Sequence, residues 1–129
     1  MQGEQVEQSV IAALDRINAR IDEFDVVVII RGGGATTDMS GFDTLALAEN
    51  VANFPLPIIT GIGHDRDECI LDMVSYMRVK TPTAAAAFLI DHLSEVYAAL
   101  VSARERISRI AERHLAYEKM RLKQLADRI

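Results

Sequence analysis

DVVVIIRGGG, residues 25–34, is the stretch that decides the expected fold, because an unbroken β-branched run ends there in three glycines. A short apolar run without polar alternation is typical of a strand that is covered on both faces of a parallel sheet. Glycines directly after such a strand let the chain turn sharply and let backbone N–H groups approach an anion. The stretch therefore predicts a buried strand over residues 25–30 and a loop at the carboxyl end of a sheet.

Helical patterns surround this strand, and a second strand follows it. Residues 4–22 carry apolar side chains at spacings of three and four, and residues 42–54 repeat that pattern. The run PIIT at residues 57–60 predicts the second strand, and a short helix is expected at residues 68–77. Strands that alternate with helices predict an α/β fold, in which a parallel sheet is joined by right-handed crossovers.

The remainder of the chain predicts one long helix. Thr81 precedes Pro82, the arrangement expected when a threonine caps a helix and a proline fills its first position. Apolar residues continue at three-and-four spacing, so the helix is expected to pack on the core and then project as the start of a coiled coil. Two strands are few for a parallel sheet, so we expect a partial, layered α/β core over residues 1–80 and the long helix over residues 81–129.

Composition limits the classes of function. Residues 1–90 hold 6 Lys and Arg against 13 Asp and Glu, whereas residues 91–129 hold 8 against 6. An acidic body argues against broad electrostatic binding of a duplex. The single cysteine, Cys69, cannot form an internal disulfide and is interpreted as a buried small side chain. No signal peptide and no uninterrupted apolar run of about 20 residues is found, so we expect a soluble, cytoplasmic protein without a membrane partner.

Two polar loops are expected at the carboxyl ends of neighbouring strands, where open α/β sheets bind their ligands. In the first loop, Arg31 stands beside Gly32, Gly33 and Gly34. A guanidinium and glycine amides together could cradle a phosphate. The alternative is a tight turn in which Arg31 forms a surface ion pair. The Lys-Ser/Thr ending of a P-loop is missing, which argues against a nucleotide-cofactor site.

The second loop, GIGHDRD at residues 61–67, places an imidazole among carboxylates. His64 beside Asp67 could act as a general acid or base on a phosphodiester, and Arg78 could neutralise phosphate charge. The structural alternatives are that Asp67 caps the following helix and that Asp72 pairs with Arg78. His64 with Asp67 or Asp72 could also ligate a divalent metal, although only one histidine is near.

Three segments in order resemble the signature of the exonuclease VII large subunit family: RGGGATTDMSGF at residues 31–42, PLPIITGIGHDRDECILD at 55–72, and MRVKTPTAAAA at 77–87. The resemblance spans residues 1–92. It implies the catalytic core of an exodeoxyribonuclease that hydrolyses single-stranded DNA from both ends to oligonucleotides and nucleotides. It also implies assembly with several copies of a small helical subunit.

The resemblance also implies roles for residues. It makes Arg31, His64, Asp67 and Asp72 the catalytic candidates. It implies no obligate cofactor, with magnesium as the cation that could assist, and pairing of two copies through the long helix as a further option. The family's strand-binding domain and another motif aspartate are expected upstream of Met1, so the isolated fragment is expected to be inactive. The phosphate-binding candidates are the loop glycines and two charged residues: Gly32, Gly33, Gly34, Gly63, Asp38 and Arg78.

The chain departs from the family's pattern at three positions, and two other functions compete. Asp65 stands where glutamate is usual, Lys80 replaces a common proline, and Ala87 replaces a common glutamate, which removes an ionisable group. One alternative function is a non-catalytic module that binds DNA and assembles the nuclease complex. The other is a domain that binds a sugar phosphate or nucleotide phosphate through the same glycines.

Overall fold

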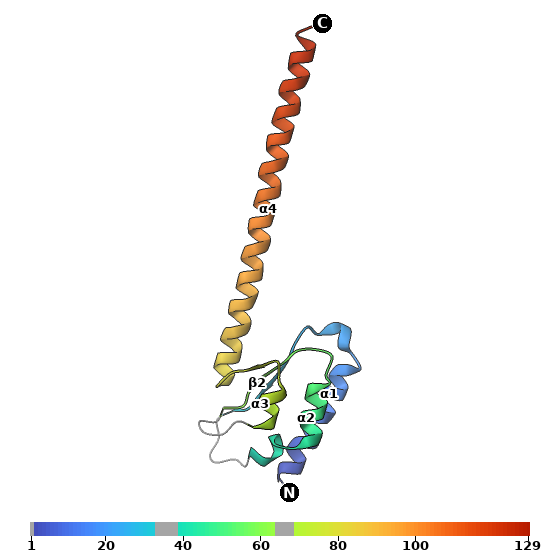
Figure 1. Ribbon diagram of the computed structural model, residues 1–129, viewed down its shortest axis with the longest axis vertical. Coiled ribbons are helices and arrows are strands. Elements are labelled where there is room, and N and C mark those ends of the chain that lie inside the picture. Colours follow the sequence, from blue (N-terminus) through green and yellow to red (C-terminus); the bar gives the residue numbers. More distant parts are fainter. Residues whose placement is uncertain (1, 33–38, 64–68) are drawn as a thin grey trace. The chain divides into compact units, whose positions relative to one another are not determined.

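The computed structural model describes residues 2–32, 39–63 and 69–129, and Figure 1 traces them in chain order. Helices and strands alternate before one long helix, as the sequence predicts. Clustering of contacts separates two compact units, residues 1–88 and 89–129, and α4 runs across that division. The elements are α1 (Gln2–Asn18), β1 (Val27–Ile30), α2 (Leu45–Ala52), β2 (Ile58–Gly61), α3 (Ile70–Val74), β3 (Met77–Arg78) and α4 (Pro82–Ala126), with 3-10 turns at Ile21–Glu23 and Met39–Phe42.

The described strands form one parallel sheet in the order β1-β2-β3, which confirms the α/β class. The sheet contains one strand more than the sequence predicted. β3 has only two residues, and its flanks continue the ladder: Tyr76 N–H donates to the Ile58 carbonyl at 2.9 Å and Val79 N–H to the Thr60 carbonyl at 2.8 Å. A strand this short shows no periodicity, so local pattern could not reveal it.

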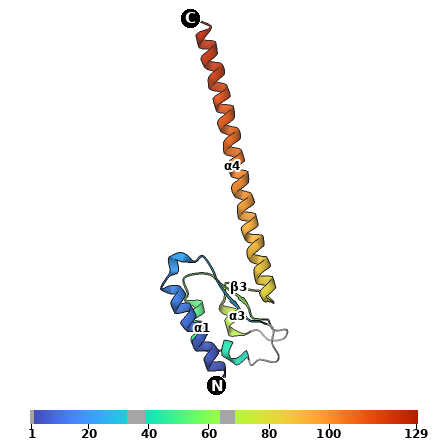
Figure 2. The same cartoon turned by 180° about the vertical axis from the view of Figure 1, so that it is seen from behind.

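The hydrophobic core lies between the sheet and the helices α1, α2 and α3. Figure 2 shows α1 and α3 from behind, and contacts join α1 to α2 and α2 to α3. Leu47 of α2 and Leu71 of α3 are fully buried, and each such side chain contributes about 1.5–3 kcal/mol. The core residues come from every layer: Leu14, Val27, Leu47, Val51, Ile58, Ile62, Cys69 and Leu71.

The two predicted strands differ in burial. All four residues of β2 are buried, as expected for a central strand of a parallel sheet. The prediction that β1 is covered on both faces is wrong at its end, since Ile30 is 55% exposed. β1 is an edge strand among the described residues, which accounts for the difference. Gly61 of β2 is packed so closely that an added Cβ would meet the Thr81 carbonyl at 3.2 Å.

Side-chain caps define where the helices begin. The Thr44 hydroxyl accepts a hydrogen bond from the Leu47 N–H at 3.3 Å at the start of α2. The Thr81 hydroxyl accepts one from the Ala84 N–H at 3.1 Å, which confirms the predicted cap of α4. The predicted α3 was too long, because α3 begins after Cys69 and ends before Ser75.

The part of α4 beyond residue 88 exposes large apolar side chains along its length. Its pairing with another helix as a coiled coil stays a prediction. By length and composition alone α4 is apolar enough to cross a membrane, with an 18-residue window of mean hydropathy 1.4, although charged residues interrupt its apolar runs. One helix of this kind does not assign a membrane location.

Candidate active site at the carboxyl edge of the sheet

The parallel strands bring two predicted site arginines to one edge of the sheet. Arg31 directly follows β1, and its N–H donates to the Gly61 carbonyl at 3.3 Å, so the β1-β2 ladder continues through it. Arg78 ends β3 and lies opposite Thr60 of β2. Neighbouring strands lie about 4.8 Å apart, and Arg31 is two residues further along its strand than the position level with Arg78, so the two arginine backbones are separated by about 12 Å with β2 between them. The sequence had placed Arg31 at this edge; Arg78 joins it through β3, a strand that was not predicted.

Both arginine side chains lie on the face of the sheet that carries the helices. The Nη1 atom of Arg31 contacts the Sδ atom of Met39, and Met39 packs against the hydrophobic core. The Nε atom of Arg78 lies 3.5 Å from the Oδ2 atom of Asp72 in α3. Arg31 forms no ion pair with any residue that the structure describes. Two cations therefore flank β2 on one face, and such a pair suits a ligand with several negative charges.

Gly63 takes a backbone conformation that favours glycine. Its φ is +70°, and an added Cβ would lie 3.2 Å from the Lys80 carbonyl oxygen. The connection after β2 thus passes close to the connection between β3 and α4. Gly32 differs, since no described atom lies within 4 Å of an added Cβ there. Glycine is therefore favoured at position 63 by its backbone conformation and close packing, whereas a side chain at position 32 would meet no described atom.

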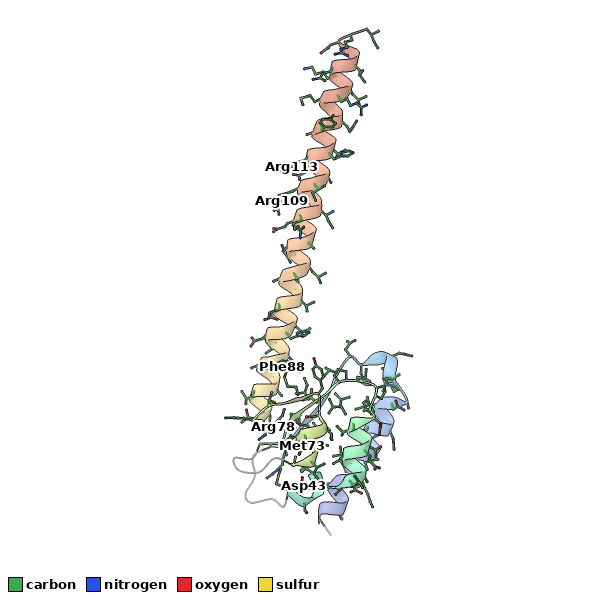
Figure 3. All side chains as sticks on the ribbon, viewed as in Figure 1. Asp43, Met73, Arg78, Phe88, Arg109 and Arg113 are labelled. Carbon is green, nitrogen blue, oxygen red and sulfur yellow. The ribbon has the colours of Figure 1, made fainter. Side chains whose placement is uncertain are left out.

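Asp72 is a buried carboxylate that pairs with Arg78. The Asp72 side chain is 4% exposed and the Arg78 side chain 34%. The structural alternative, an Asp72–Arg78 ion pair, is therefore present, and Figure 3 shows where Arg78 lies on the sheet. A carboxylate this deeply buried needs a cation or several hydrogen-bond donors to remain charged. Catalysis by Asp72 itself stays a prediction.

Hydrogen bonds that the sequence did not reveal hold α3 in place. The Ser75 hydroxyl donates to the Asp72 carbonyl at 2.9 Å and lies 3.2 Å from the Thr60 hydroxyl of β2. The Ile70 N–H donates to the Asp43 carboxylate at 2.7 Å. A polar residue inside an apolar strand indicates a buried hydrogen bond, and Thr60 gave that indication in the sequence without revealing its partner.

The first residue of α3 is bonded from a distant part of the chain. The N-cap position is Cys69, whose side chain makes no cap hydrogen bond, and Asp67, which the sequence offered as a cap, lies outside the described residues. Asp43, labelled in Figure 3, bonds the first N–H group of α3 from 27 residues earlier. Long-range capping of this kind has no local sequence pattern.

Cys69 is 2% exposed, which confirms the interpretation of a buried small side chain. Burial raises the pKa of the Cys69 thiol from 9.0 to about 11, a backbone hydrogen bond from Asp72 opposes that rise, and the negative charge of Asp72 adds to it. The thiol therefore stays protonated at neutral pH, and a protonated thiol is a poor nucleophile.

Five predicted site residues, Gly33, Gly34, Asp38, His64 and Asp67, lie outside the described residues. Within the described ranges, no three His, Cys, Asp or Glu residues gather as a metal site would require. The metal hypothesis involved His64 and Asp67, so it stays a prediction.

The first unit also contains a hollow of about 300 Å³, which is a weaker candidate for the ligand site than the carboxyl edge of the sheet. It lies between α1 and α2, where Asp15, Asn18, Glu49 and Asn50 contribute to its lining. Pro55, which precedes β2, also lines it, so the hollow is near the amino end of that strand. Ligands of open parallel sheets bind at the carboxyl ends, where Arg31 and Arg78 lie.

Comparison with known proteins agrees with the resemblance seen in the sequence. The family described as "Exonuclease VII, large subunit" matches residues 1–129. The chain is 36% identical over 132 residues to the exodeoxyribonuclease 7 large subunit of Cyanothece sp., which covers 97% of this chain and 31% of that protein. It is 34% identical over 128 residues to the protein of that name from Thermobifida fusca, which covers 99% and 31%.

A shorter region is more similar, at 47% identity over 66 residues, to the exodeoxyribonuclease 7 large subunit of Deinococcus radiodurans, covering 51% of this chain and 16% of that protein. The chain spans between 24% and 31% of the length of the first curated relatives that it matches. The family match covers the whole chain, and relatives above 30% identity cover nearly all of it. The chain belongs to the exonuclease VII large subunit family.

Proposed function

We propose that this chain forms part of the catalytic core of an exodeoxyribonuclease that hydrolyses single-stranded DNA from both ends to oligonucleotides and 5'-nucleotides. One observation carries the proposal: Arg31 and Arg78 flank β2 at the edge from which the GIGHDRD loop leaves. The names of the relatives, exodeoxyribonuclease 7 large subunit, support the same reaction class. Cations held at a fixed edge of a sheet stabilise the charge of a phosphodiester during hydrolysis.

In the proposed mechanism, Arg31 and the amides of Gly32, Gly33 and Gly34 hold the scissile phosphate. His64, supported by Asp67, moves a proton on the attacking water or the leaving oxygen. No cofactor is obligate in this scheme, because proton transfer and charge stabilisation both come from side chains. Magnesium could assist by neutralising phosphate charge.

Single-stranded DNA and a small helical subunit are the proposed partners, in the cytoplasm. Along α4, Leu93, Leu100 and Ile107 are spaced by seven residues, and these three and Ile110, three residues further on, are each between 64% and 68% exposed. An apolar stripe this exposed suits a partner helix. The 45 residues of α4 extend for about 68 Å, which leaves room for several small helical proteins.

The chemistry of the same stripe favours a different chain over a second copy. His114, Arg121 and Arg128 continue the seven-residue series that starts at Leu93. In a parallel, in-register pair of identical helices each of these residues would face its own copy. Like charges at such positions oppose pairing. Basic side chains such as Arg113, labelled in Figure 3, also suit an acidic partner.

The test uses the full-length large subunit assembled with its small subunit, which digests end-labelled single-stranded DNA with EDTA or with magnesium. His64→Ala and Arg31→Ala are expected to abolish digestion while assembly persists. Arg16→Ala, at an exposed position on α1, is the matched control and should digest normally. Digestion that survives both His64→Ala and Arg31→Ala would overturn the proposed chemistry and favour a non-catalytic DNA-binding and assembly module.

A further inference from the structure

Asp72 and Arg78 form a pair whose two members differ sharply in access to solvent. Thr60 and Asp72 are the buried polar residues among those that the structure describes. The Asp72 side chain is 4% exposed, whereas its partner Arg78 is 34% exposed. A group that touches a phosphodiester or its attacking water must be reachable. Of the two, only Arg78 meets that requirement. Asp72 is therefore the inner anion of the pair, and Arg78 is the outer cation.

Asp72, the inner anion, is fixed by hydrogen bonds of its backbone. The backbone N–H of Asp72 donates to the Cys69 carbonyl at 3.0 Å in the first turn of α3. Its carbonyl accepts the Ser75 hydroxyl at 2.9 Å, and Ser75 lies within 3.2 Å of the Thr60 hydroxyl. The neighbouring Leu71 is fully buried. Packing and hydrogen bonds on both sides of Asp72 thus fix where its carboxylate stands relative to β2.

The contact with Arg78 is made through the atom that sets the plane of the guanidinium. The Nε atom of Arg78 lies 3.5 Å from the Asp72 carboxylate, and the Arg78 backbone is fixed opposite Thr60. A guanidinium is planar, so a contact at Nε together with a fixed backbone restricts how the group can turn. A lysine ammonium could approach the carboxylate, but it has no plane that such a contact would fix.

We propose that Asp72 is a positioning residue, which orients the Arg78 guanidinium for a backbone phosphate of the single strand and does not itself take part in hydrolysis. The inference rests on the proposed function for the identity of the substrate. It changes the role suggested by the family resemblance, in which Asp72 is a catalytic candidate. Arg78 becomes the group that contacts DNA, and Asp72 acts through it.

The test measures how binding depends on salt, in the full-length large subunit assembled with its small subunit. The probe is a labelled single-stranded oligonucleotide with phosphorothioate linkages, which slow hydrolysis. Each phosphate contact on a single strand contributes about 0.7 to the slope of log K against log salt. Arg78→Gln should lower the slope by about 0.7. Asp72→Asn should lower it equally, and the double variant should lower it no further.

A second pair of variants keeps the test decisive if Asp72→Asn does not fold. Arg78→Lys keeps the charge but replaces the planar guanidinium with a freely rotating ammonium that Asp72 cannot orient, so it should lower the slope as Arg78→Gln does. Arg16→Gln on α1 removes an exposed arginine with no proposed contact and should leave the slope unchanged. A normal slope in Arg78→Lys would mean that charge alone matters, and orientation by Asp72 would be disproved.

Three other outcomes would overturn the proposal in distinguishable ways. A normal slope in Arg78→Gln would show that Arg78 contacts no phosphate. A normal slope with a lowered melting temperature in Asp72→Asn would reduce Asp72 to a structural role. A further loss of kcat from Asp72→Asn in the Arg78→Gln background would make Asp72 catalytic. The binding slope does not depend on hydrolysis, so failure of the proposed chemistry at His64 would be seen separately.

Discussion

Replacing Gly63 with alanine tests the most specific backbone feature of the site. At a φ of +70° an L side chain is strained, and left-handed helical backbone costs about 1–2 kcal/mol. The new Cβ would also lie 3.2 Å from the Lys80 carbonyl oxygen, which is backbone and cannot move alone. Alanine restricts the unfolded chain and so returns about 0.4–1 kcal/mol. The net expectation for Gly63→Ala is a loss of about 1 kcal/mol.

Gly32→Ala is the matched control, because it adds the same methyl group where no described atom lies within 4 Å of it. Of the two glycines, Gly63 is the one with positive φ. Both substitutions share the effect on the unfolded chain, so their difference isolates the strain at Gly63, about 1–2 kcal/mol. Gly32→Ala alone should leave stability unchanged or raise it slightly.

Differential scanning calorimetry of the two variants provides the measurement, since the chain contains no tryptophan. For a unit of 88 residues, 1 kcal/mol corresponds to about 4–8 °C in Tm. Gly63→Ala should melt at least several degrees below Gly32→Ala. Equal melting temperatures for the two variants would refute the assignment of a strained, closely packed glycine after β2.

Three further predictions concern the caps and the buried thiol. Raising the pH from 9 to 11 should destabilise the fold by about 2 kcal/mol, because the Cys69 thiol ionises at lower pH in the unfolded chain than in the folded one. Urea midpoints across that pH range should fall more for the wild type than for Cys69→Ala. Thr81→Ala should lower stability by about 1 kcal/mol, because it removes the hydroxyl that accepts from the Ala84 N–H. Thr81→Ser keeps a hydroxyl and should retain most of the wild-type stability, so equal Tm values for the two variants would exclude a cap. Asp43→Ala should also cost about 1 kcal/mol of stability, and it should speed hydrogen exchange at the Ile70 amide. An unchanged exchange rate at that amide would contradict the hydrogen bond between Ile70 and Asp43.

Sequence patterns located the elements whose signals are local. The β-branched run before Arg31 became β1, PIIT became the fully buried β2, and the Thr81-Pro82 pair began α4. The length of α3 and the existence of β3 could not be predicted in the same way. α3 has five residues and β3 two, lengths at which neither helical nor strand periodicity is visible.

The position of the candidate site at one edge of the sheet depends more on the order and direction of the strands than on the motifs themselves. Parallel strands end at one edge, so the position of Arg31 after β1 could be predicted, whereas that of Arg78 depends on β3 and could not. The contacts that support them join distant residues, as between Asp43 and Ile70 or Thr60 and Ser75. Such pairs depend on how the layers pack, which one sequence does not encode locally. The roles of Asp38, His64 and Asp67 stay predictions.

The position of β1 at the margin of the sheet has a practical consequence for anyone who handles this chain in solution. In this chain, which spans 24–31% of the length of the first curated relatives that it matches, no described strand other than β2 bonds β1, whose outer side carries backbone N–H and C=O groups beside the apolar residues Val27–Ile30. An apolar strand with an open side is a template for another strand. Dilute samples, or a lysine placed at the half-exposed Val28, should keep preparations dispersed for the calorimetry and binding experiments above.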